Sequence, residues 1–497
     1  MISRVSHIAT HGNNYGKLMF LIGCLLALPL CMLPFYKAEV GYAGAFLIPS
    51  AISIGLSLVV FAISPPKETE TVTAWQAPIA RGSLPVLFAW CYAFIMGAIP
   101  FVIAGQADIQ YAIFESVSGW TTTGLTVIDV TTLPRIFLFH RSFMQFCGGL
   151  GFIIMIDMLI QNKHAMNLFV AEGHKDRVMP SLRQTSRVIF LLYICFLALG
   201  VGAYIICGMG FFDAVCHTMS ALSTAGFSTK AGTIGDYGSP AIELTTVVLM
   251  LIGATNVTAL LLMVKGRWRQ LARVSELRFM VCMMLIVVPL CAFSLFADNG
   301  MSVGESLLES LFGVVTAFTT TGYSTMDYAN WPPFALGLFY LMMIAGGCMG
   351  STAGGVKLTR LNIMLRAVWA NILKSLSPNR KITALSYYTP QGKMPIDDTL
   401  VSDTLCFVTV YMIILAAGTL ALTVTAKCLL FDAMFMFTSA LGTVGISNGL
   451  SDANTNTPTL VVEIIGMILG RLEVFIVFIG LYSGFSTIKE AAAQRSR

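Results

Sequence analysis

Long apolar stretches, separated by short polar segments, run along most of the 497-residue chain. A helix needs about 20 mostly apolar residues to cross the hydrocarbon core of a bilayer. By this measure the pattern predicts about ten membrane-spanning helices, one of them interrupted by glycines. The predicted spans are 18–36, 44–63, 84–104, 136–161, 187–207, 240–264, 278–297, the interrupted 334 to about 375, 401–425 and 459–487.

Four further apolar segments are only about a dozen residues long, which is too short to span a bilayer. They are 108–120, 211–223, 305–318 and 430–441. Non-helical backbone at membrane depth is tolerated only where protein buries it or where it lines a water-filled cavity. We therefore expect four re-entrant helices, which enter the membrane and return to the same side.

The composition agrees with a membrane protein and excludes an ordinary soluble enzyme. Hydrophobic residues make up 56% of the chain and charged residues 11%, whereas soluble proteins carry roughly 25% charged residues. The six histidines form no HExxH motif or His/Asp set, and no phosphate-binding loop pattern is present. We expect neither an enzyme nor a bound cofactor.

Lysine and arginine residues cluster in three loops, and loops rich in these residues stay in the cytoplasm. The loops lie at 163–187, 265–278 and 357–393 and hold most of the 30 basic residues. With this orientation the four short segments enter from the outside and both termini are cytoplasmic. Because topology already explains the basic clusters, an RNA- or lipid-binding surface is the weaker reading of them. We expect membrane lipid around the spans and no nucleic-acid partner.

A fourfold repeat follows the short segments. The copies read SGWTTTGLT from Ser118, SALSTAGFS from Ser220, TAFTTTGYS from Thr316 and SALGTVGIS from Ser439. The pattern common to all four is Thr-x-Gly. One copy alone is equally well read as a helix C-cap followed by a turn, but four copies in register indicate a shared function.

Acidic residues precede the repeated glycines. Asp213, Glu309 and Asp432 stand at one common position before three of them, and Asp108 lies near the equivalent place in the first repeat. We expect these carboxylates to cap the N-terminal ends of the short helices, where the helix dipole is positive.

The repeated loops have a chemistry that suits a cation. Glycine allows backbone angles that turn carbonyl oxygens toward a common axis, and rings of carbonyls replace the hydration shell of potassium in selectivity filters. The short helices would point their negative C-terminal ends at that axis. Four such loops could surround one ion.

The interrupted span contains five glycines and two hydroxyl residues within ten positions, which should break the helix. This segment holds Gly346, Gly347, Gly350, Ser351, Thr352, Gly354 and Gly355. Arg471 lies in the otherwise apolar last span, where a charge costs roughly 2.5–3.5 kcal/mol and should face a partner inside the bundle. One reading is a structural ion pair of Arg471 with nearby Glu473 or with another acidic side chain. Asp157 and Asn256 also lie in spans, but no partner or repeat argument supports a role for them.

The Thr-x-Gly loops resemble the selectivity-filter loops of the Trk/Ktr/HKT superfamily of potassium transporters. The resemblance covers nearly the whole chain, and the two extra spans before the first repeat are similar to the branch of TrkH- and TrkG-type membrane subunits. It implies an all-α polytopic membrane protein with four membrane-pore-membrane repeats around one central pore. The implied filter residues are Thr122, Thr123, Gly124, Thr224, Ala225, Gly226, Thr320, Thr321, Gly322, Thr443, Val444 and Gly445.

The resemblance further implies a gate and an organisation of the chain. The glycine-rich segment would be an intramembrane gating loop below the filter, and Arg471 would project into the pore and interact with it. The implied units are an N-terminal two-helix extension at 1–80 and pore repeats at 81–180, 181–274, 275–395 and 396–497.

The function that follows is potassium uptake across a bacterial cytoplasmic membrane, with the potassium ion as substrate. The resemblance implies a homodimer that docks a cytosolic, TrkA-like nucleotide-binding regulatory subunit. The alternative is a proton- or sodium-coupled secondary transporter, including a symporter. Its hallmark would be inverted repeats with broken helices at matching places.

Overall fold

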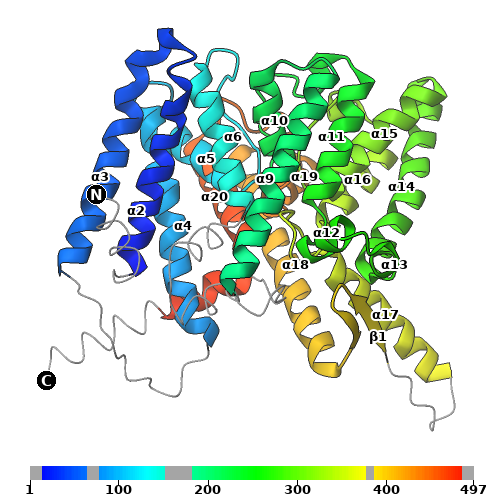
Figure 1. Ribbon diagram of the computed structural model, residues 1–497. Coiled ribbons are helices and arrows are strands. Elements are labelled where there is room, and N and C mark those ends of the chain that lie inside the picture. The colour runs from blue at the N-terminus through cyan, green and yellow to red at the C-terminus, as the bar shows by residue number, and fades with distance from the viewer. Residues whose placement is uncertain (1–13, 64–77, 151–181, 377–384, 484–497) are drawn as a thin grey trace, which may run out of the picture.

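The computed structural model describes residues 14–63, 78–150, 182–376 and 385–483 (Figure 1). Within these ranges the chain is helical apart from one antiparallel hairpin, which the sequence pattern did not predict. Strand β1 (Ser386–Thr389) pairs with β2 (Gly392–Pro395), with Ser386 opposite Pro395. The hairpin lies at the same side of the molecule as α17, toward the bottom of Figure 1.

Helices succeed one another along the described ranges and are mostly joined by short loops. The α-helices are α2 (Asn14–Ala27), α3 (Ala43–Ile63), α4 (Pro78–Ile103), α5 (Ile109–Trp120), α6 (Arg135–Gly149), α9 (Leu182–Ile206), α10 (Phe211–Leu222), α11 (Pro240–Gly253), α12 (Val257–Val264), α13 (Trp268–Leu271), α14 (Ser275–Asn299), α15 (Val303–Phe318), α16 (Pro333–Ala345), α17 (Leu358–Leu376), α18 (Asp398–Ala426), α19 (Leu430–Leu441) and α20 (Thr457–Arg471). The 3-10 helices are η1 (Leu28–Met32), η2 (Lys37–Tyr42), η3 (Gly235–Tyr237) and η4 (Tyr328–Asn330).

Six helices of the described residues are long and apolar enough to cross a membrane, or up to eight if each of two sharply bent pairs is one span. Leu199, Leu285, Phe293 and Val424 are large apolar residues on these helices that stay exposed, as expected where lipid surrounds the protein. Of the further spans expected from the sequence, one continues from α6 into residues outside the described ranges. The other is divided by the loop between α16 and α17.

The chain after α3 forms four units, each with a long helix, a short helix and a second helix. They are α4–α5–α6, α9–α10–α11, α14–α15–α16 and α18–α19–α20. The short helices α5, α10, α15 and α19 match the four short apolar segments to within two residues at each end. In every unit the short helix packs against both neighbours of its own unit.

The four units are joined in a closed ring by contacts of one kind. The second helix of each unit packs on the short helix of the next: α6 on α10, α11 on α15, α16 on α19, and α20 on α5. The last of these contacts joins the fourth unit to the first. Each short helix is therefore enclosed by two helices of its own unit and by the second helix of the unit before it.

Within the described residues, three of the second helices are interrupted, whereas the sequence pattern predicted only one interruption. The pair α11 and α12 bends by 112°, and α20 bends by 98° relative to the following helix, Val474–Ser483. Residues 346–357 separate α16 from α17. The predicted continuous spans 240–264 and 459–487 are thus wrong. Hydropathy measures only apolarity, and both breaks keep an apolar composition.

Candidate functional site

The four repeated loops leave their short helices with one shared backbone conformation. The first threonine of each Thr-x-Gly, namely Thr122, Thr224, Thr320 and Thr443, has a φ angle between 50 and 55°. The glycines that follow have φ angles between 77 and 92°. A β-branched residue at positive φ is a conformational outlier. Its occurrence four times at one position indicates that the surrounding structure imposes it.

Hydrogen bonds at the helix ends show how this conformation arises. In the first repeat, the N–H of Thr122 donates to the Gly119 carbonyl at 3.1 Å and the N–H of Thr123 to the Ser118 carbonyl at 2.9 Å. The same two bonds close α10, α15 and α19. This is the Schellman arrangement. The helix C-cap interpretation of Thr-x-Gly is therefore correct, and it holds in all four repeats.

The glycines place the four loops in a ring. A Cβ atom added at any of them would lie 2.0–2.1 Å from a carbonyl oxygen of the next loop. The pairs are Gly124 with Ala225, Gly226 with Thr321, Gly322 with Val444, and Gly445 with Thr123. The chain of contacts passes through all four repeats and returns to the first. Because backbone meets backbone here, only glycine fits at these positions.

A hollow lies on the side of the ring toward which the chain runs after each repeat glycine. All four repeat glycines line it, and so do the hydroxyl residues two positions after each glycine, Thr126, Ser228, Ser324 and Ser447. We call this hollow the outer vestibule. Its symmetric lining indicates that one axis passes through the four loops.

Two of the acidic residues predicted to cap the short helices bind hydroxyl groups of the repeated loops. Asp213 accepts a hydrogen bond from the Thr229 hydroxyl at 2.7 Å, and Glu309 accepts one from the Thr325 hydroxyl. Both hydroxyls lie three residues after a repeat glycine, so each acid ties the outgoing loop to its own short helix. The expectation of helix capping is wrong for Glu309.

The N-terminal ends of the short helices differ in how they are capped. Ser302 and Glu305 form the capping box of α15, and Asp108 is the N-cap of α5 without a side-chain cap bond. Asp432 lies in the first turn of α19, where its carbonyl oxygen accepts a bond from Asn448 at 3.2 Å.

On the other side of the ring, the glycine-rich loop 346–357 forms hydrogen bonds with two of the four repeat threonines. The N–H of Gly354 donates to the Thr320 hydroxyl at 2.7 Å. The Thr352 hydroxyl lies 3.0 Å from that of Thr224 and donates to the Leu222 and Gly253 carbonyls at 3.2 and 3.0 Å. This loop thus lies directly against the ring.

The break between α11 and α12 holds the same loop from the side. The N–H groups of Cys348 and Thr352 donate to the Ala254 and Gly253 carbonyls. Asn256 caps α12 by accepting from the Thr258 N–H at 2.8 Å, and its Nδ2 donates to the Met349 carbonyl at 2.6 Å. Sequence reasoning gave Asn256 no role. An N-cap residue after Gly253 inside an apolar run was the signal for a break.

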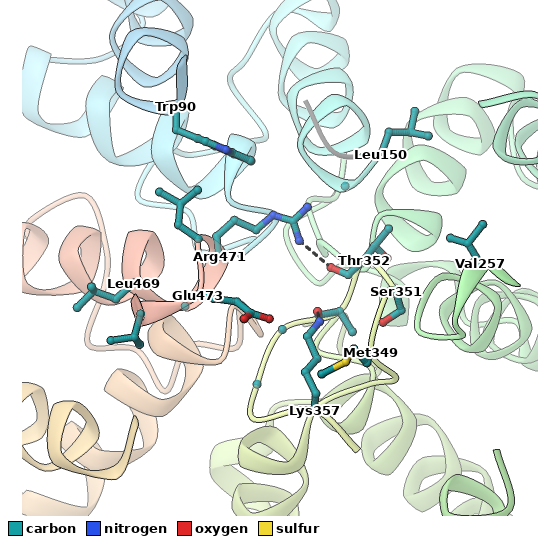
Figure 2. Close-up of a pocket in the computed structure, with 18 of the residues that line it drawn as sticks. Trp90, Leu150, Val257, Met349, Ser351, Thr352, Lys357, Leu469, Arg471 and Glu473 are labelled. Carbon is teal, nitrogen blue, oxygen red and sulfur yellow. Dashed lines mark hydrogen bonds between the residues drawn. The ribbon is translucent and has the colours of Figure 1, made fainter. Parts of the chain in front are cut away.

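Arg471 is the last residue of α20 and points toward the glycine-rich loop (Figure 2). Its guanidinium donates to the Thr352 carbonyl at 3.0 Å and to the Gly148 carbonyl. Glu473, the candidate partner from the sequence, forms an ion pair with Arg360 at 2.9 Å. Arg471 thereby links the loop to α6 of the first unit. Its place at a helix break, and not within a continuous span, is a correction.

A pocket extends from this linkage. It is lined by Trp90 of α4, Leu150, much of the loop, Lys357, Arg471 and Glu473. Lys357 donates to the Ala353 carbonyl. The pocket and the outer vestibule lie on opposite sides of the ring.

Sequence reasoning missed three buried polar residues beside the ring. Glu115 of α5 and Arg141 of α6 form an ion pair at 2.5 Å with side chains almost fully buried, and Gln145 contacts the second loop. A charge inside an apolar segment marks a functional site by default, and this signal could have identified Glu115 and Arg141.

The possible cation ligands around the ring are backbone carbonyl and hydroxyl oxygens, which suit a hard cation. Among the described residues, no group of three or more His, Cys, Asp and Glu side chains forms a metal site.

Comparisons with known proteins agree with this geometry. A family model described as TrkH, cation transport protein, matches residues 79–482. The chain is 28% identical to the Trk system potassium uptake protein TrkG of Escherichia coli K12, over 97% of this chain and 99% of the relative. It is 30% identical to the Trk system potassium uptake protein TrkH of Vibrio parahaemolyticus, over 81% of this chain and 85% of the relative. The crystal structure of the potassium transporter TrkH from Vibrio parahaemolyticus aligns with a TM-score of 0.78 at 26% identity, covering 94% of this chain and 98% of that chain.

Proposed function

Because the chain belongs to the TrkH family of cation transport proteins, we propose that it takes up potassium through one pore lined by its four Thr-x-Gly loops. The observation that carries the proposal is the closed ring, in which each repeat glycine meets the carbonyl of the next loop. The similar proteins of Escherichia coli and Vibrio parahaemolyticus are named potassium uptake proteins.

Carbonyl oxygens at the ring replace the hydration shell of an entering cation. The C-terminal ends of α5, α10, α15 and α19 carry the negative end of the helix dipole and face the ring, which favours positive charge there. A membrane potential supplies about 2.3 kcal/mol per elementary charge per 100 mV, so inward movement needs no ATP.

The gate consists of the loop 346–357 and Arg471. This proposal is supported by the hydrogen bonds of the loop to Thr224 and Thr320 and by the two carbonyls that Arg471 binds. A fixed positive charge below the filter opposes cations while the loop is in place. Withdrawal of the loop opens the path.

The chain acts as a homodimer in the bacterial cytoplasmic membrane, with both termini in the cytoplasm. A cytosolic nucleotide-binding subunit of the TrkA type docks on the basic cytoplasmic face and moves the gate. A proton- or sodium-coupled transporter remains the competing function. Potassium uptake that requires a proton or sodium gradient, in addition to membrane potential, would favour it.

Replacement of Gly226 by serine tests the pore. A Cβ at Gly226 would lie 2.0 Å from the Thr321 carbonyl, so Gly226→Ser must displace the ring. We expect uptake of rubidium to fall and uptake of sodium to rise in cells that lack their own potassium uptake. Gly210→Ser is the matched control. It adds the same side chain at the N-cap of α10, the short helix that leads to Gly226, and a Cβ there meets nothing within 4 Å.

The wild-type chain should restore growth of these cells on low potassium when the regulatory subunit is present. Sodium uptake without rescue would overturn the substrate assignment. Equal selectivity of Gly226→Ser and Gly210→Ser would overturn the filter.

A further inference from the structure

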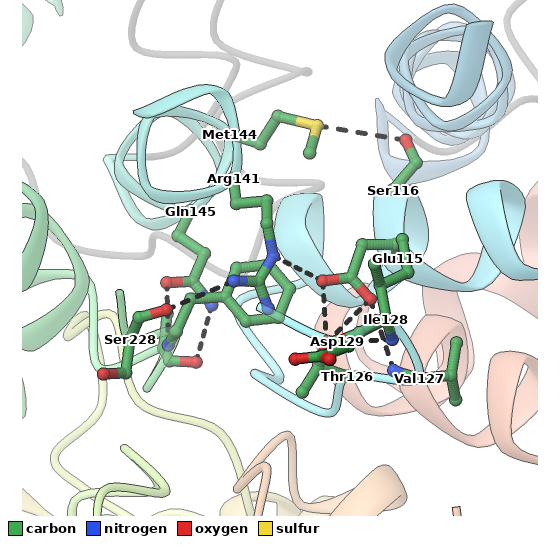
Figure 3. A network of polar contacts seen from close by, with 12 residues as sticks. Glu115, Ser116, Thr126, Val127, Ile128, Asp129, Arg141, Met144, Gln145 and Ser228 are labelled. Atoms are coloured by element: carbon green, nitrogen blue, oxygen red, sulfur yellow. Dashed lines mark hydrogen bonds and ion pairs between the residues drawn. The ribbon is translucent and has the colours of Figure 1, made fainter. Parts of the chain in front are cut away.

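The buried ion pair behind the ring links two neighbouring loops of the proposed filter (Figure 3). On the side of the first loop, Glu115 accepts from the Thr126 hydroxyl at 3.0 and 3.1 Å and from the Val127 N–H at 3.4 Å. Thr126 and Val127 follow Gly124 after one intervening residue. Glu115 therefore fixes the outgoing half of the first loop.

Arg141 carries the linkage to the second loop. Its Nε donates to Glu115 at 2.5 Å, and its Nη1 donates to the Ser228 carbonyl at 3.2 Å. The guanidinium also lies over the Phe227 ring, 4.0 Å from its centroid. Because Arg141 comes from α6 of the first unit and Ser228 from the second unit, one side chain spans the boundary between the units.

Gln145, one helical turn further along α6, holds the second loop on both sides of its glycine. Its Nε2 donates to the Ala225 carbonyl at 2.7 Å, and its Oε1 accepts from the Phe227 N–H at 3.2 Å. The Ala225 carbonyl is the same oxygen that a Cβ at Gly124 would meet. Gln145 thus sets the direction of a carbonyl at the closest approach of the first two loops.

Two further side chains contact the second loop. His217 lies 3.0 Å from the Ser228 hydroxyl, and Tyr323 of the third loop donates to the Phe227 carbonyl at 3.2 Å. The Glu115–Arg141 pair has almost no exposed side-chain surface, whereas the Arg360–Glu473 pair is partly exposed. The connection between the first two loops is therefore the more deeply buried of these two ion pairs.

We propose that Glu115, Arg141 and Gln145 are positioning residues that set the spacing between the first and second filter loops and thereby the preference for potassium over sodium. The inference rests on the proposed function. Discrimination between the two ions depends on how carbonyl oxygens replace hydration, and these residues fix the carbonyls of Ala225 and Ser228. Arg141 also lines the outer vestibule, where Glu115 offsets its charge.

The test compares rubidium and sodium uptake in cells that lack their own potassium uptake. Gln145→Met keeps length and neutrality but removes both bonds to the second loop. Arg141→Lys keeps the charge but loses the planar fork that reaches both Glu115 and Ser228. We expect the rubidium-to-sodium ratio to fall about tenfold in each variant, which corresponds to about 1.4 kcal/mol.

Glu115→Gln adds a second, different readout. It leaves the Arg141 charge beside the vestibule without its carboxylate, so uptake of both ions should fall together. Arg135→Gln is the control, because it removes an exposed positive charge at the start of the same helix as Arg141 and should leave the ratio unchanged.

The outcomes separate the two proposals. A wild-type chain that takes up neither ion overturns the proposed function and this inference with it. A selective wild-type chain whose ratio is unchanged in Gln145→Met overturns only the inference. Gln145→Met buries no unpaired charge, so it decides the question even if a charge variant fails to accumulate in the membrane.

Discussion

Individual residues in this protein tolerate backbone conformations that ordinary packing avoids. A non-glycine residue in a sparsely populated region costs on the order of 1–3 kcal/mol and persists only where the surroundings impose it. Thr122, Thr224, Thr320 and Thr443 all adopt such a conformation. The same energetic cost at all four threonines supports a functional reason for this conformation, because the turn brings the following glycine close to a carbonyl oxygen of the next loop.

Glycines behind the ring allow an equally close approach. A Cβ at Gly470 would lie 2.0 Å from the Leu441 carbonyl at the end of α19. We expect Gly470→Ala to lower stability by about 1–3 kcal/mol, because backbone must shift to admit the methyl group. Thermal unfolding of the purified protein in detergent measures this.

Gly466→Ala, one turn earlier on α20, is the control. Its Cβ would meet the Phe437 ring at 3.0 Å, a side chain that can move by the few tenths of an ångström required. Equal melting temperatures of the two variants would show that α20 and α19 are not in such close contact at Gly470.

At the scale of elements, the broken helices and the loop 346–357 form one hydrogen-bonded assembly. The breaks after Gly253 and Arg471 free backbone groups at membrane depth, where each unsatisfied group costs several kcal/mol. The carbonyls of Gly253 and Ala254 accept N–H groups of the loop, and Arg471 binds the loop carbonyl of Thr352. The loop and the breaks therefore stabilise one another.

Thr352→Val tests whether the loop 346–357 and the helix breaks close the ion path through the pore. The change removes the hydroxyl that binds the Leu222 and Gly253 carbonyls and keeps the shape of the side chain. We expect higher basal rubidium uptake without the regulatory subunit, and Arg471→Ala should act in the same direction.

Ser351→Ala is the control for this experiment, because the Ser351 hydroxyl donates within the loop, to the Cys348 carbonyl at 2.6 Å. Unchanged basal uptake in both Thr352→Val and Arg471→Ala would remove the loop from the gate.

At the scale of the whole molecule, the four units form a ring that needs no second copy to close. The contact of α20 with α5 joins the end of the chain to its first unit. The second and third basic loops begin near α12 and α17, on the side away from the N-terminal ends of the short helices (Figure 1). The first basic loop and both termini lie largely or wholly outside the described residues.

Labelling with a membrane-impermeant thiol reagent tests the orientation of this ring. Gly304→Cys, at the start of α15, should react from outside intact cells, whereas Arg269→Cys in α13 should react only after the membrane is opened. Both positions are exposed. Cys207 and Cys428 are replaced by serine to lower the background labelling. Both residues follow the ends of long helices, α9 and α18, on the side where these helices lead to short helices. Reaction of Arg269→Cys in intact cells would show that the protein has the opposite orientation in the membrane.

The sequence predicted much of this architecture because its signals are local. Apolar length indicated most of the spans, and the short segments α5, α10, α15 and α19 were placed almost to the residue. Repetition of Thr-x-Gly identified the loops that meet at the ring. The break at Gly346 followed from glycine content. Each inference used properties of one contiguous segment.

Other features depend on which segments become neighbours, and local pattern does not contain that information. Asn256 matters because the Met349 carbonyl lies 2.6 Å away, and Glu473 pairs with Arg360 on another unit. The link from Glu115 through Arg141 to Ser228 likewise joins residues of different units. Hydropathy and repetition thus determined the spans, the four loops and their common chemistry. Only the tertiary structure decided their cyclic order, the helix breaks and the partners of buried charges, because those follow from contacts between distant segments.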